Sequence, residues 1–180
     1  MLVGKLVTLE PLEERHVPGL REAAADERAW TWMTTRDVEA WIATALAATD
    51  VFHFAVLRNG AVAGSTSYLN VVPEHRRLEI GHTWNHPSAW GTGVNTEAKY
   101  LLLRHAFEEL GMHRVEFKTD AKNERARAAL AALPAEFEGI HRKHMVVRGG
   151  ERRDSAWYAV IDDDWPVVKA ALERRIAARG

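Results

Sequence analysis

The dipeptide Asn59-Gly60 most restricts the possible folds, because it separates two runs of strand-forming residues in the stretch VFHFAVLRNGAVAGSTSYLNVV. Both residues tolerate a positive φ angle, and Asn-Gly is the strongest short signal for a β-hairpin. Another strand-like run, HRRLEIGHTWN, follows at once, and two more flank the turn RGGE. Consecutive hairpins favour a largely antiparallel sheet and argue against a doubly wound parallel one.

The remaining segments predict helices packed on this sheet. Residues 15–25 and 36–48 are expected to be helical, and so is the segment after Gly93, where apolar residues recur at helical spacing. A strand over 113–120, a short helix over 123–133 and a closing helix in DDDWPVVKAALERRIAA complete the chain. The predicted order is β-α-α-β-β-β-α-β-α-β-β-α, an α+β arrangement. An interior glycine, Gly81, predicts a bulge or a close approach by a ligand in the strand that contains it.

The chain as a whole predicts one domain over residues 1–180, since no repeat or long linker divides it. Its 24 basic and 25 acidic side chains nearly balance, which argues against a general nucleic-acid or acidic-membrane binder. The absence of cysteine excludes disulfides, thiolate metal sites and a cysteine nucleophile. Glu10 interrupts any signal-peptide hydrophobic region, and no apolar run approaches the roughly 20 residues that span a bilayer. We therefore expect a soluble, cytoplasmic protein.

A glycine-rich loop, Trp90-Gly91-Thr92-Gly93, directly precedes the helix expected from Val94. Such a loop presents free N–H groups and the positive end of the helix dipole to an anion, so a phosphate or pyrophosphate is one candidate ligand. A tight turn that lets the helix pack closely is the alternative. The P-loop pattern fails because Val94, not lysine, follows Gly93, and the three-glycine dinucleotide pattern is incomplete.

With the stretches HPSAWGTGVNTEAKYLLLRHAFEELGMHRVEFKTDAKNERARAAL and EFEGIHRKHMVVRGGERRDSAWYAVIDDDWP, the chain resembles the GNAT superfamily of acyl-CoA-dependent N-acetyltransferases. The most similar branch contains the ribosomal-protein N-terminal acetyltransferases, and the resemblance runs from about Val7 to Trp165. It implies a GNAT-like α+β fold whose mixed, mostly antiparallel sheet has about six to seven strands flanked by helices. It also implies direct transfer of an acetyl group from acetyl-CoA to a primary amine, on a small molecule or a protein N-terminus.

In that family, a loop of the form Arg/Gln-x-x-Gly-x-Gly/Ala holds the pyrophosphate of coenzyme A with backbone N–H groups. The resemblance places this cofactor-binding loop on Trp90, Gly91, Thr92, Gly93, Val94 and Asn95. Asn95 departs from the pattern, because a small residue is usual there, and it either adds an amide hydrogen bond or crowds the loop. Asn123 matches an asparagine that helps to hold the cofactor in many members, although a plain helix N-cap would also explain it.

Acetyl transfer requires a deprotonated amine, so a general base is expected. Glu79 is the first candidate, because by resemblance the strand EIGHTW runs beside the thioester and strand parity turns Glu79 away from its apolar neighbours. The alternative is a sheet-surface glutamate paired with Arg76 or Arg77. His82 is the second candidate, since the unperturbed histidine pKa of about 6.5 suits the task, although a lone histidine in a strand is more often structural.

The general acid is the weak point of the match. The helix after Asn123 carries Leu130 and Ala126 where family members carry a tyrosine or a serine. Tyr158 is a substitute candidate, although a buried strand tyrosine has the same pattern, and a thiolate with a pKa of about 8.5 also leaves without an acid. The missing hydroxyls support a second hypothesis, a non-catalytic acyl-CoA-binding protein or sensor.

The acceptor site is expected near residues 29–36 and the hairpin around Gly149. Trp30 and Trp32 are candidate substrate-binding residues, because their position between two helices suits a groove wall as well as a core. A run of basic residues at the hairpin either attracts an acidic acceptor or is solvated turn charge. That run comprises Arg142, Lys143, Arg148, Arg152 and Arg153.

Metal binding is not expected. The histidine pairs His82 with His86 and His141 with His144 lack clustered carboxylates or cysteines. The family resemblance is compatible with a homodimer, and composition neither supports nor opposes one.

Overall fold

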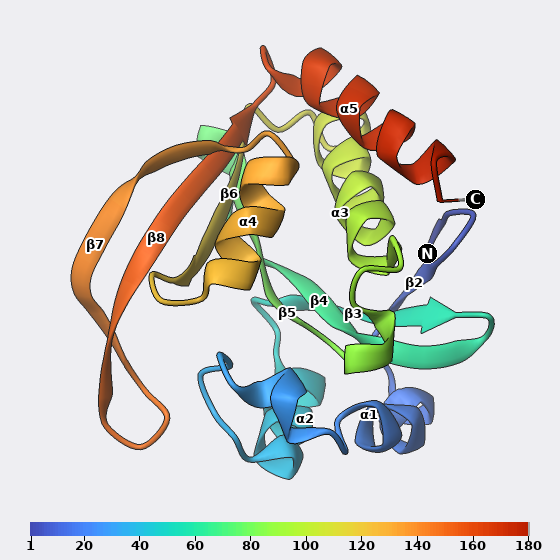
Figure 1. Ribbon diagram of the computed structural model, residues 1–180, viewed down its shortest axis with the longest axis vertical. Coiled ribbons are helices and arrows are strands. Elements are labelled where there is room, and N and C mark those ends of the chain that lie inside the picture. Colours follow the sequence, from blue (N-terminus) through green and yellow to red (C-terminus); the bar gives the residue numbers. More distant parts are fainter. Residues whose placement is uncertain (180) are drawn as a thin grey trace.

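The computed structural model describes residues 1–179 and shows one eight-stranded sheet flanked by helices (Figure 1). The strands are β1 (Leu2–Val3), β2 (Thr8–Pro11), β3 (Phe52–Arg58), β4 (Ala61–Val72), β5 (Arg77–Asn85), β6 (Arg114–Asp120), β7 (Glu136–Val147) and β8 (Glu151–Ile161). Their order in the sheet is β1-β2-β3-β4-β5-β6-β8-β7, and every neighbouring pair is antiparallel except β5 with β6. The mixed, mostly antiparallel α+β prediction is confirmed. The strand number exceeds the expected six to seven, because the two-residue β1 is too short to give a sequence signal.

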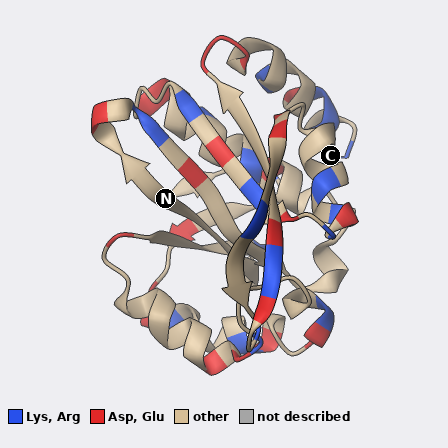
Figure 2. Ribbon diagram, turned by 90° about the vertical axis from the view of Figure 1, so that its left-hand side faces the viewer, with Lys and Arg blue, Asp and Glu red and all other residues tan. Residues whose placement is uncertain are grey.

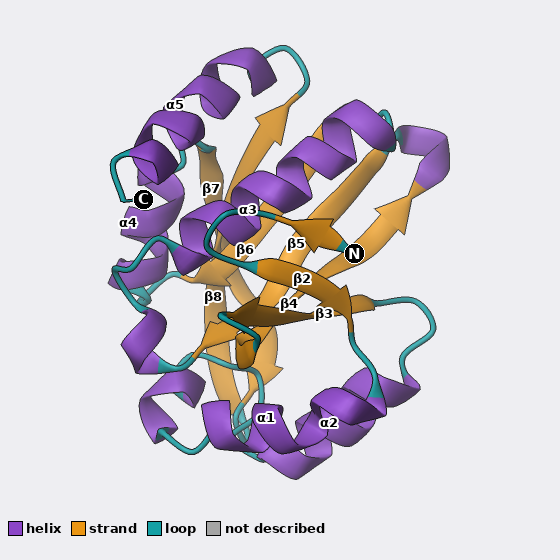
Figure 3. Ribbon diagram, turned by 90° about the vertical axis from the view of Figure 1, so that its right-hand side faces the viewer, coloured by secondary structure: helices purple, strands orange, loops and turns teal. Residues whose placement is uncertain are grey.

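The helices are α1 (Val17–Ala23), α2 (Val38–Ala47), α3 (Val94–Arg104), α4 (Glu124–Ala132) and α5 (Trp165–Ala177). α3 lies across one face of the sheet with α5 beside it, while α1 and α2 lie together near one end of the molecule (Figure 3). A π-helical turn, His105–Glu109, continues α3. None of the helices within residues 1–179 combines the length and apolarity that crossing a bilayer requires.

The predicted hairpin is confirmed. Asn59 and Gly60 have φ angles of 51° and 80° and join β3 to β4. Two adjacent residues with positive φ match the twist of the flanking strands, which is why this dipeptide closes hairpins so well.

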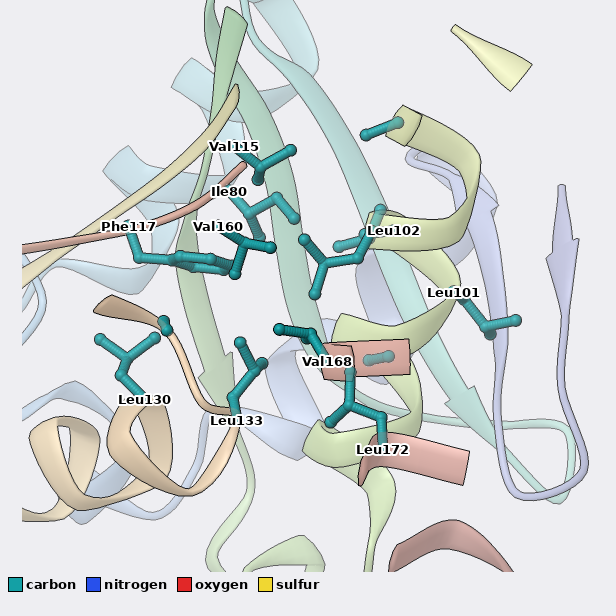
Figure 4. Packing of buried hydrophobic residues seen from close by; sticks show 14 of the residues in the cluster. Ile80, Leu101, Leu102, Val115, Phe117, Leu130, Leu133, Val160, Val168 and Leu172 are labelled. Atoms are coloured by element: carbon teal, nitrogen blue, oxygen red, sulfur yellow. The ribbon is translucent and has the colours of Figure 1, made fainter. Parts of the chain in front are cut away.

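The main core lies between the sheet and the helices α3, α4 and α5 (Figure 4). Its most deeply buried members come from the strands β2, β3, β5, β6 and β8 and from the helices, and include Ile80, Leu102, Val115, Val160 and Leu172. A second core lies under α1 and α2, where the ring centroids of Trp30 and Trp84 are 4.8 Å apart and those of Trp30 and Trp41 are 5.7 Å apart. Trp30 is 3% exposed and donates its indole N–H to the Ala24 carbonyl, so it is a core residue.

A buried carboxylate joins the start of the chain to α3. Glu97 Oε2 accepts hydrogen bonds from the backbone N–H groups of Leu6 (2.6 Å) and Val7 (2.8 Å), and Oε1 accepts one from Lys5 (2.9 Å). Hydrogen bonds to an ionised acceptor are roughly twice as strong as neutral ones. The N-terminal segment is therefore fixed behind the glycine-rich loop.

The two parallel strands separate after a short contact. Only Arg77, Leu78 and Glu79 of β5 pair with β6, and the strands diverge beyond Glu79. A bulge in β5 follows, where His82 and Thr83 together oppose Thr66 of β4 and His82 adopts a φ of 47°. The predicted bulge thus occurs next to Gly81 rather than on it. Because a bulge bends the strand that contains it, it turns β5 away from β6.

Candidate functional site

A cavity of about 340 Å³ lies where β5 and β6 diverge. β5 and β6 form its walls, the glycine-rich loop and α3 close one end, and α4, β8 and the segment before α2 complete it. Of the residues selected from the sequence, seven line the cavity: Trp32, Glu79, His82, Trp90, Gly91, Asn95 and Asn123. Five do not: Trp30, Thr92, Gly93, Val94 and Tyr158.

The two glycines of the loop have different surroundings. Both have positive φ angles, 74° at Gly91 and 97° at Gly93. A Cβ on Gly91 would meet only open space, whereas one on Gly93 would approach Leu6 Cδ1 to 2.9 Å and Arg179 Cδ to 3.2 Å. Gly91 therefore leaves the cavity open, while Gly93 allows close packing. The close-packing interpretation describes Gly93, whereas ligand binding beside Gly91 stays a prediction.

The loop end of the cavity offers several donors to an anion. No backbone oxygen of residues 1–179 accepts from the N–H of Gly91 or from those of Val94–Thr96 in the first turn of α3. The buried amide oxygen of Asn95 has no partner within the described chain, but it is an acceptor and therefore does not contribute to anion binding. The Arg125 guanidinium lies 3.4 Å from the centroid of the Trp90 ring and lines the same opening. The free backbone N–H groups and the Arg125 cation can together bind a phosphate.

Asn123 has the capping role that its position suggests. Its Oδ1 accepts a hydrogen bond of 3.1 Å from the backbone N–H of Ala126, so it is the N-cap of α4. It also lines the cavity, so capping and ligand contact are compatible.

Glu79 is buried, with 1% of its surface exposed. Its Oε2 accepts hydrogen bonds from Lys118 Nζ (2.8 Å) and Asn70 Nδ2 (2.7 Å). Arg77 pairs with Glu116 instead, at 3.4 Å. The expected alternative partners, Arg76 and Arg77, are therefore wrong: the partner comes from β6, beyond the point where the two strands separate.

His82 lies on the bulge and also lines the cavity. Its Nδ1 is buried without a partner in the described structure, and its ring stacks on His53 at 5.7 Å. Burial lowers the pKa of His82 below its ordinary value of 6.5, against the opposing effect of the Glu79 charge. The imidazole is therefore neutral at neutral pH and can accept a proton.

Tyr158 is buried outside the cavity. Its hydroxyl accepts a hydrogen bond of 3.1 Å from Arg127 Nε, and its ring packs against Phe137 at 5.2 Å. Ala126 and Leu130 do line the cavity, so the hydroxyls that they replace are missing from its wall.

Lys99 of α3 is a cavity residue that the sequence did not indicate. Its Nζ donates hydrogen bonds to the hydroxyls of Thr83 (2.6 Å) and Thr66 (3.3 Å) and lies 5.9 Å from the centroid of the Phe117 ring. The Lys99 amino group therefore contacts β4 and β5 and faces the Phe117 ring of β6. Burial lowers the pKa of Lys99 from 10.5 to about 7.

This burial predicts a pH-dependent cost in stability. Between about pH 7 and 10.5 the unfolded chain binds more protons at Lys99 than the folded chain, so the wild type gains stability as the pH rises through that window. Below pH 7 the cost is fully present. We expect Lys99→Met to raise the free energy of unfolding at pH 6 by on the order of a few kcal/mol relative to wild type, with the difference shrinking toward pH 10. Urea denaturation at several pH values measures it.

Lys122→Met is the control for this experiment, because Lys122 is exposed. A difference between Lys99→Met and wild type that stays constant from pH 6 to pH 10 would contradict the assignment.

The far end of the cavity is closed by the β7–β8 hairpin. Arg148, in its turn, pairs with Asp120 at 3.0 Å, and both side chains are 4% exposed. Arg148 also donates its backbone N–H to the Thr34 carbonyl (2.9 Å) and Nη1 to the Met33 carbonyl (3.2 Å). The hairpin is therefore attached to the segment before α2, so the two regions expected to shape the acceptor site lie side by side.

The basic run at this hairpin divides into two groups. Arg148 and Arg153 turn inward, whereas Arg142, Lys143 and Arg152 are exposed. His141 and His144 lie on the outside against the Trp157 ring. Within residues 1–179, no group of three or more His, Cys, Asp or Glu residues is arranged to hold a metal ion.

Comparison with known proteins identifies the family. Residues 7–135 match a family model described as "Acetyltransferase (GNAT) domain". A Bacillus subtilis protein named "Putative ribosomal N-acetyltransferase YdaF" is 31% identical over 110 residues, which are 61% of this chain and 59% of that protein. The match therefore spans less than two thirds of this curated relative.

Solved structures share the whole architecture. The crystal structure of a "putative acetyltransferase" from T. thermophilus is 40% identical with a TM-score of 0.89, covering 97% of this chain and 96% of that one. "Mycobacterium smegmatis RimJ in complex with CoA-disulfide" is 23% identical with a TM-score of 0.80, covering 96% and 88%. At that identity the second match shows a common fold.

Proposed function

Because the chain belongs to the acetyltransferase (GNAT) family, we propose that it transfers an acetyl group from acetyl-CoA directly to a primary amine, on a small molecule or a protein N-terminus. We further propose that residues 1–180 act as a single catalytic domain in the cytoplasm. The relative named as a ribosomal N-acetyltransferase supports a protein N-terminus as one acceptor class.

One observation carries this proposal: the same cavity is lined by the glycine-rich loop and by Glu79 and His82. The residues at the loop end fit coenzyme A, because Gly91 leaves space and several backbone N–H groups have no backbone acceptor and can donate to a pyrophosphate. The Asn95 amide oxygen, which lacks a partner, can accept from a donor group of the ligand. The RimJ structure with CoA-disulfide supports a nucleotide thiol on this fold.

The chain's own side chains supply the proton transfers. Acetyl-CoA, when bound, supplies an acyl thioester that an amine can attack. Glu79 accepts the amine proton through a water molecule, and neutral His82 is the second acceptor beside it. With no hydroxyl at Ala126 or Leu130, Lys99 is the cavity side chain with a proton to give near neutral pH. The backbone of β5 that faces away from β4 remains available for hydrogen bonds to the ligand.

The missing hydroxyls also favour a second candidate, a non-catalytic acyl-CoA-binding sensor. Calorimetric titration with acetyl-CoA, with ATP and NADH as controls, tests the ligand that both candidates share. Release of CoA thiol in the presence of a panel of primary amines separates them. Amine-dependent turnover above background eliminates the sensor, whereas binding of acetyl-CoA without turnover on any amine supports it.

Arg125→Ala is expected to raise the Kd for acetyl-CoA about tenfold, because it removes the cation that stacks on Trp90 at the loop. The increase should diminish at high salt, since the interaction is partly exposed. Calorimetry at two ionic strengths measures it. Arg152→Ala, an exposed arginine on β8, is the matched control and should leave the Kd unchanged. Equal Kd values for Arg125→Ala and wild type would remove Arg125 from the cofactor site.

A further inference from the structure

Arg153 of β8 is a buried arginine without an ionic partner. It is 7% exposed, lines the cavity and forms no ion pair with a carboxylate of residues 1–179. Its Nε is buried and has no hydrogen-bond partner in that range. Strand parity places it with Ser155 and Trp157, on the face opposite to the core residues Ala156 and Tyr158. A buried cation is costly unless an anion compensates it.

The nearby carboxylates are already paired. Glu79 binds Lys118 at 2.8 Å and Asn70 at 2.7 Å. Asp120 binds Arg148 at 3.0 Å and accepts the backbone N–H of Lys122 at 3.0 Å. Arg148 also pairs with Glu151 at 3.0 Å. Lys118 and Arg148 thus have carboxylate partners, and Arg153 is left without one in the described chain.

The histidines nearby add no negative charge and no competing positive one. Burial lowers the pKa of His82, and burial together with the Lys118 charge lowers that of His144. From β7, Met145 pairs with Arg153 in the strand register and contributes an apolar side chain. Basic and acidic positions are interspersed along the strands in Figure 2. What distinguishes Arg153 is the missing hydrogen-bond partner of its buried Nε.

We propose that the Arg153 guanidinium binds a carboxylate of the amine acceptor, so that the preferred acceptors are amines that carry a carboxylate close to the amino group. The guanidinium fork suits a carboxylate, because two parallel N–H bonds can form. The carboxylate could belong to a free amino acid or to an acidic side chain near a peptide N-terminus. The inference rests on the proposed function, since it names the acceptor class of that same site.

Matched acceptors test this proposal by CoA thiol release. The small-molecule arm compares L-alanine with L-alaninamide, and the peptide arm compares Ala-Asp-amide with Ala-Asn-amide. In at least one arm we expect the carboxylate member to show a kcat/KM about tenfold or more above its neutral partner. Arg153→Met should remove this preference through KM and leave the neutral partner within about twofold, while Arg153→Lys should retain part of it.

Two controls belong to this experiment. Arg152→Met, one residue away and exposed, should keep the preference. The Kd for acetyl-CoA should be the same in Arg153→Met and wild type. A wild type without preference in either arm, an equal loss for charged and neutral acceptors, or weaker acetyl-CoA binding in Arg153→Met would each overturn the proposal.

A binding measurement separates this inference from the proposed function. The NMR signal of Arg153 Nε–Hε, assigned by its loss in Arg153→Met, is followed in the acetyl-CoA-free protein during titration with N-acetyl-L-alanine and N-acetyl-Ala-Asp-amide. The signal should shift to saturation with at least one of them and stay in place with N-acetyl-L-alaninamide. If it shifts but no amine is acetylated, the carboxylate site stands and the proposed transferase function fails. A signal that no carboxylate moves overturns the inference, whatever the activity.

Discussion

Replacing Glu79 with glutamine is expected to lower kcat for amine acetylation by about a hundredfold or more, because the variant cannot accept the amine proton. Glutamine keeps the size of the side chain and one oxygen to accept from Lys118 or Asn70. The Kd for acetyl-CoA should change little, since the loop residues and Arg125 are untouched. Thiol release as a function of pH and calorimetry measure the two effects.

Glu116→Gln is the matched control for this variant. Glu116 of β6 lies opposite Glu79 in the strand register but pairs with Arg77 and Arg114 outside the cavity. Its kcat should stay within about twofold of wild type, because Glu116 does not line the cavity. An unchanged pH–rate profile in Glu79→Gln would show that Glu79 is not the base, and His82 would then be the next residue to replace.

Replacing Arg148 with methionine is expected to lower the free energy of unfolding by about 3–5 kcal/mol, because it leaves the buried carboxylate of Asp120 without its counter-charge. The attachment of the hairpin turn to the Met33 carbonyl is lost as well. Adding Asp120→Asn to Arg148→Met should recover a large part of the loss, since the charge is then gone and the side chain can still accept from Lys122. Urea denaturation of the two single variants and the double variant gives the coupling energy.

Arg36→Met provides the comparison for an exposed pair, because Arg36 lies 3.6 Å from Glu151 on the surface. Arg36→Met should change the free energy of unfolding by no more than about 1 kcal/mol. Additive losses at Asp120 and Arg148 would mean that the two residues act separately, and the closure of the cavity would then need another explanation.

The sequence predicted the elements whose signals are local. Asn59-Gly60 gave the hairpin, and the apolar spacing after Gly93 gave α3. Gly91 and Gly93 marked the loop, but their division between open space and close packing depends on Leu6 and Arg179, which are distant in sequence.

The residues that sequence reasoning missed depend on distant pairing. Lys99, between Ala98 and Tyr100, has the pattern of an ordinary helix-surface lysine, and only the divergence of β5 from β6 places it in a cavity. Likewise, Glu79 meets Lys118 because two strands 39 positions apart run in parallel. The sequence does not distinguish the buried Arg153 from the exposed Arg152. The lack of an ionic partner for Arg153 depends on the pairing of Asp120 with Arg148, which is a tertiary contact.

Tyr158 and Trp30 were candidate site residues, but both are core residues. Each has a residue type suited to a binding site, but the alternation of β8 turns Tyr158 into the core, and Trp30 packs against Trp41 and Trp84. Aromatic residues bury large apolar areas, so type alone does not distinguish a groove wall from a core.

The divergence of β5 and β6 also bears on how the molecule avoids aggregation. A strand with an unpaired side is normally a template for another chain, which proteins counter by shortening, bending or covering it. Beyond Glu79, the facing sides of β5 and β6 have no strand partner within residues 1–179, yet they border a cavity that is also lined by α3, α4 and the segment before α2. At the outer margins, β1 has only two residues and β7 is interrupted by irregular register near Gly139 and Lys143. The fold can thus keep unpaired main-chain groups for a small extended ligand without exposing a long unpaired edge strand on which another molecule could add a strand.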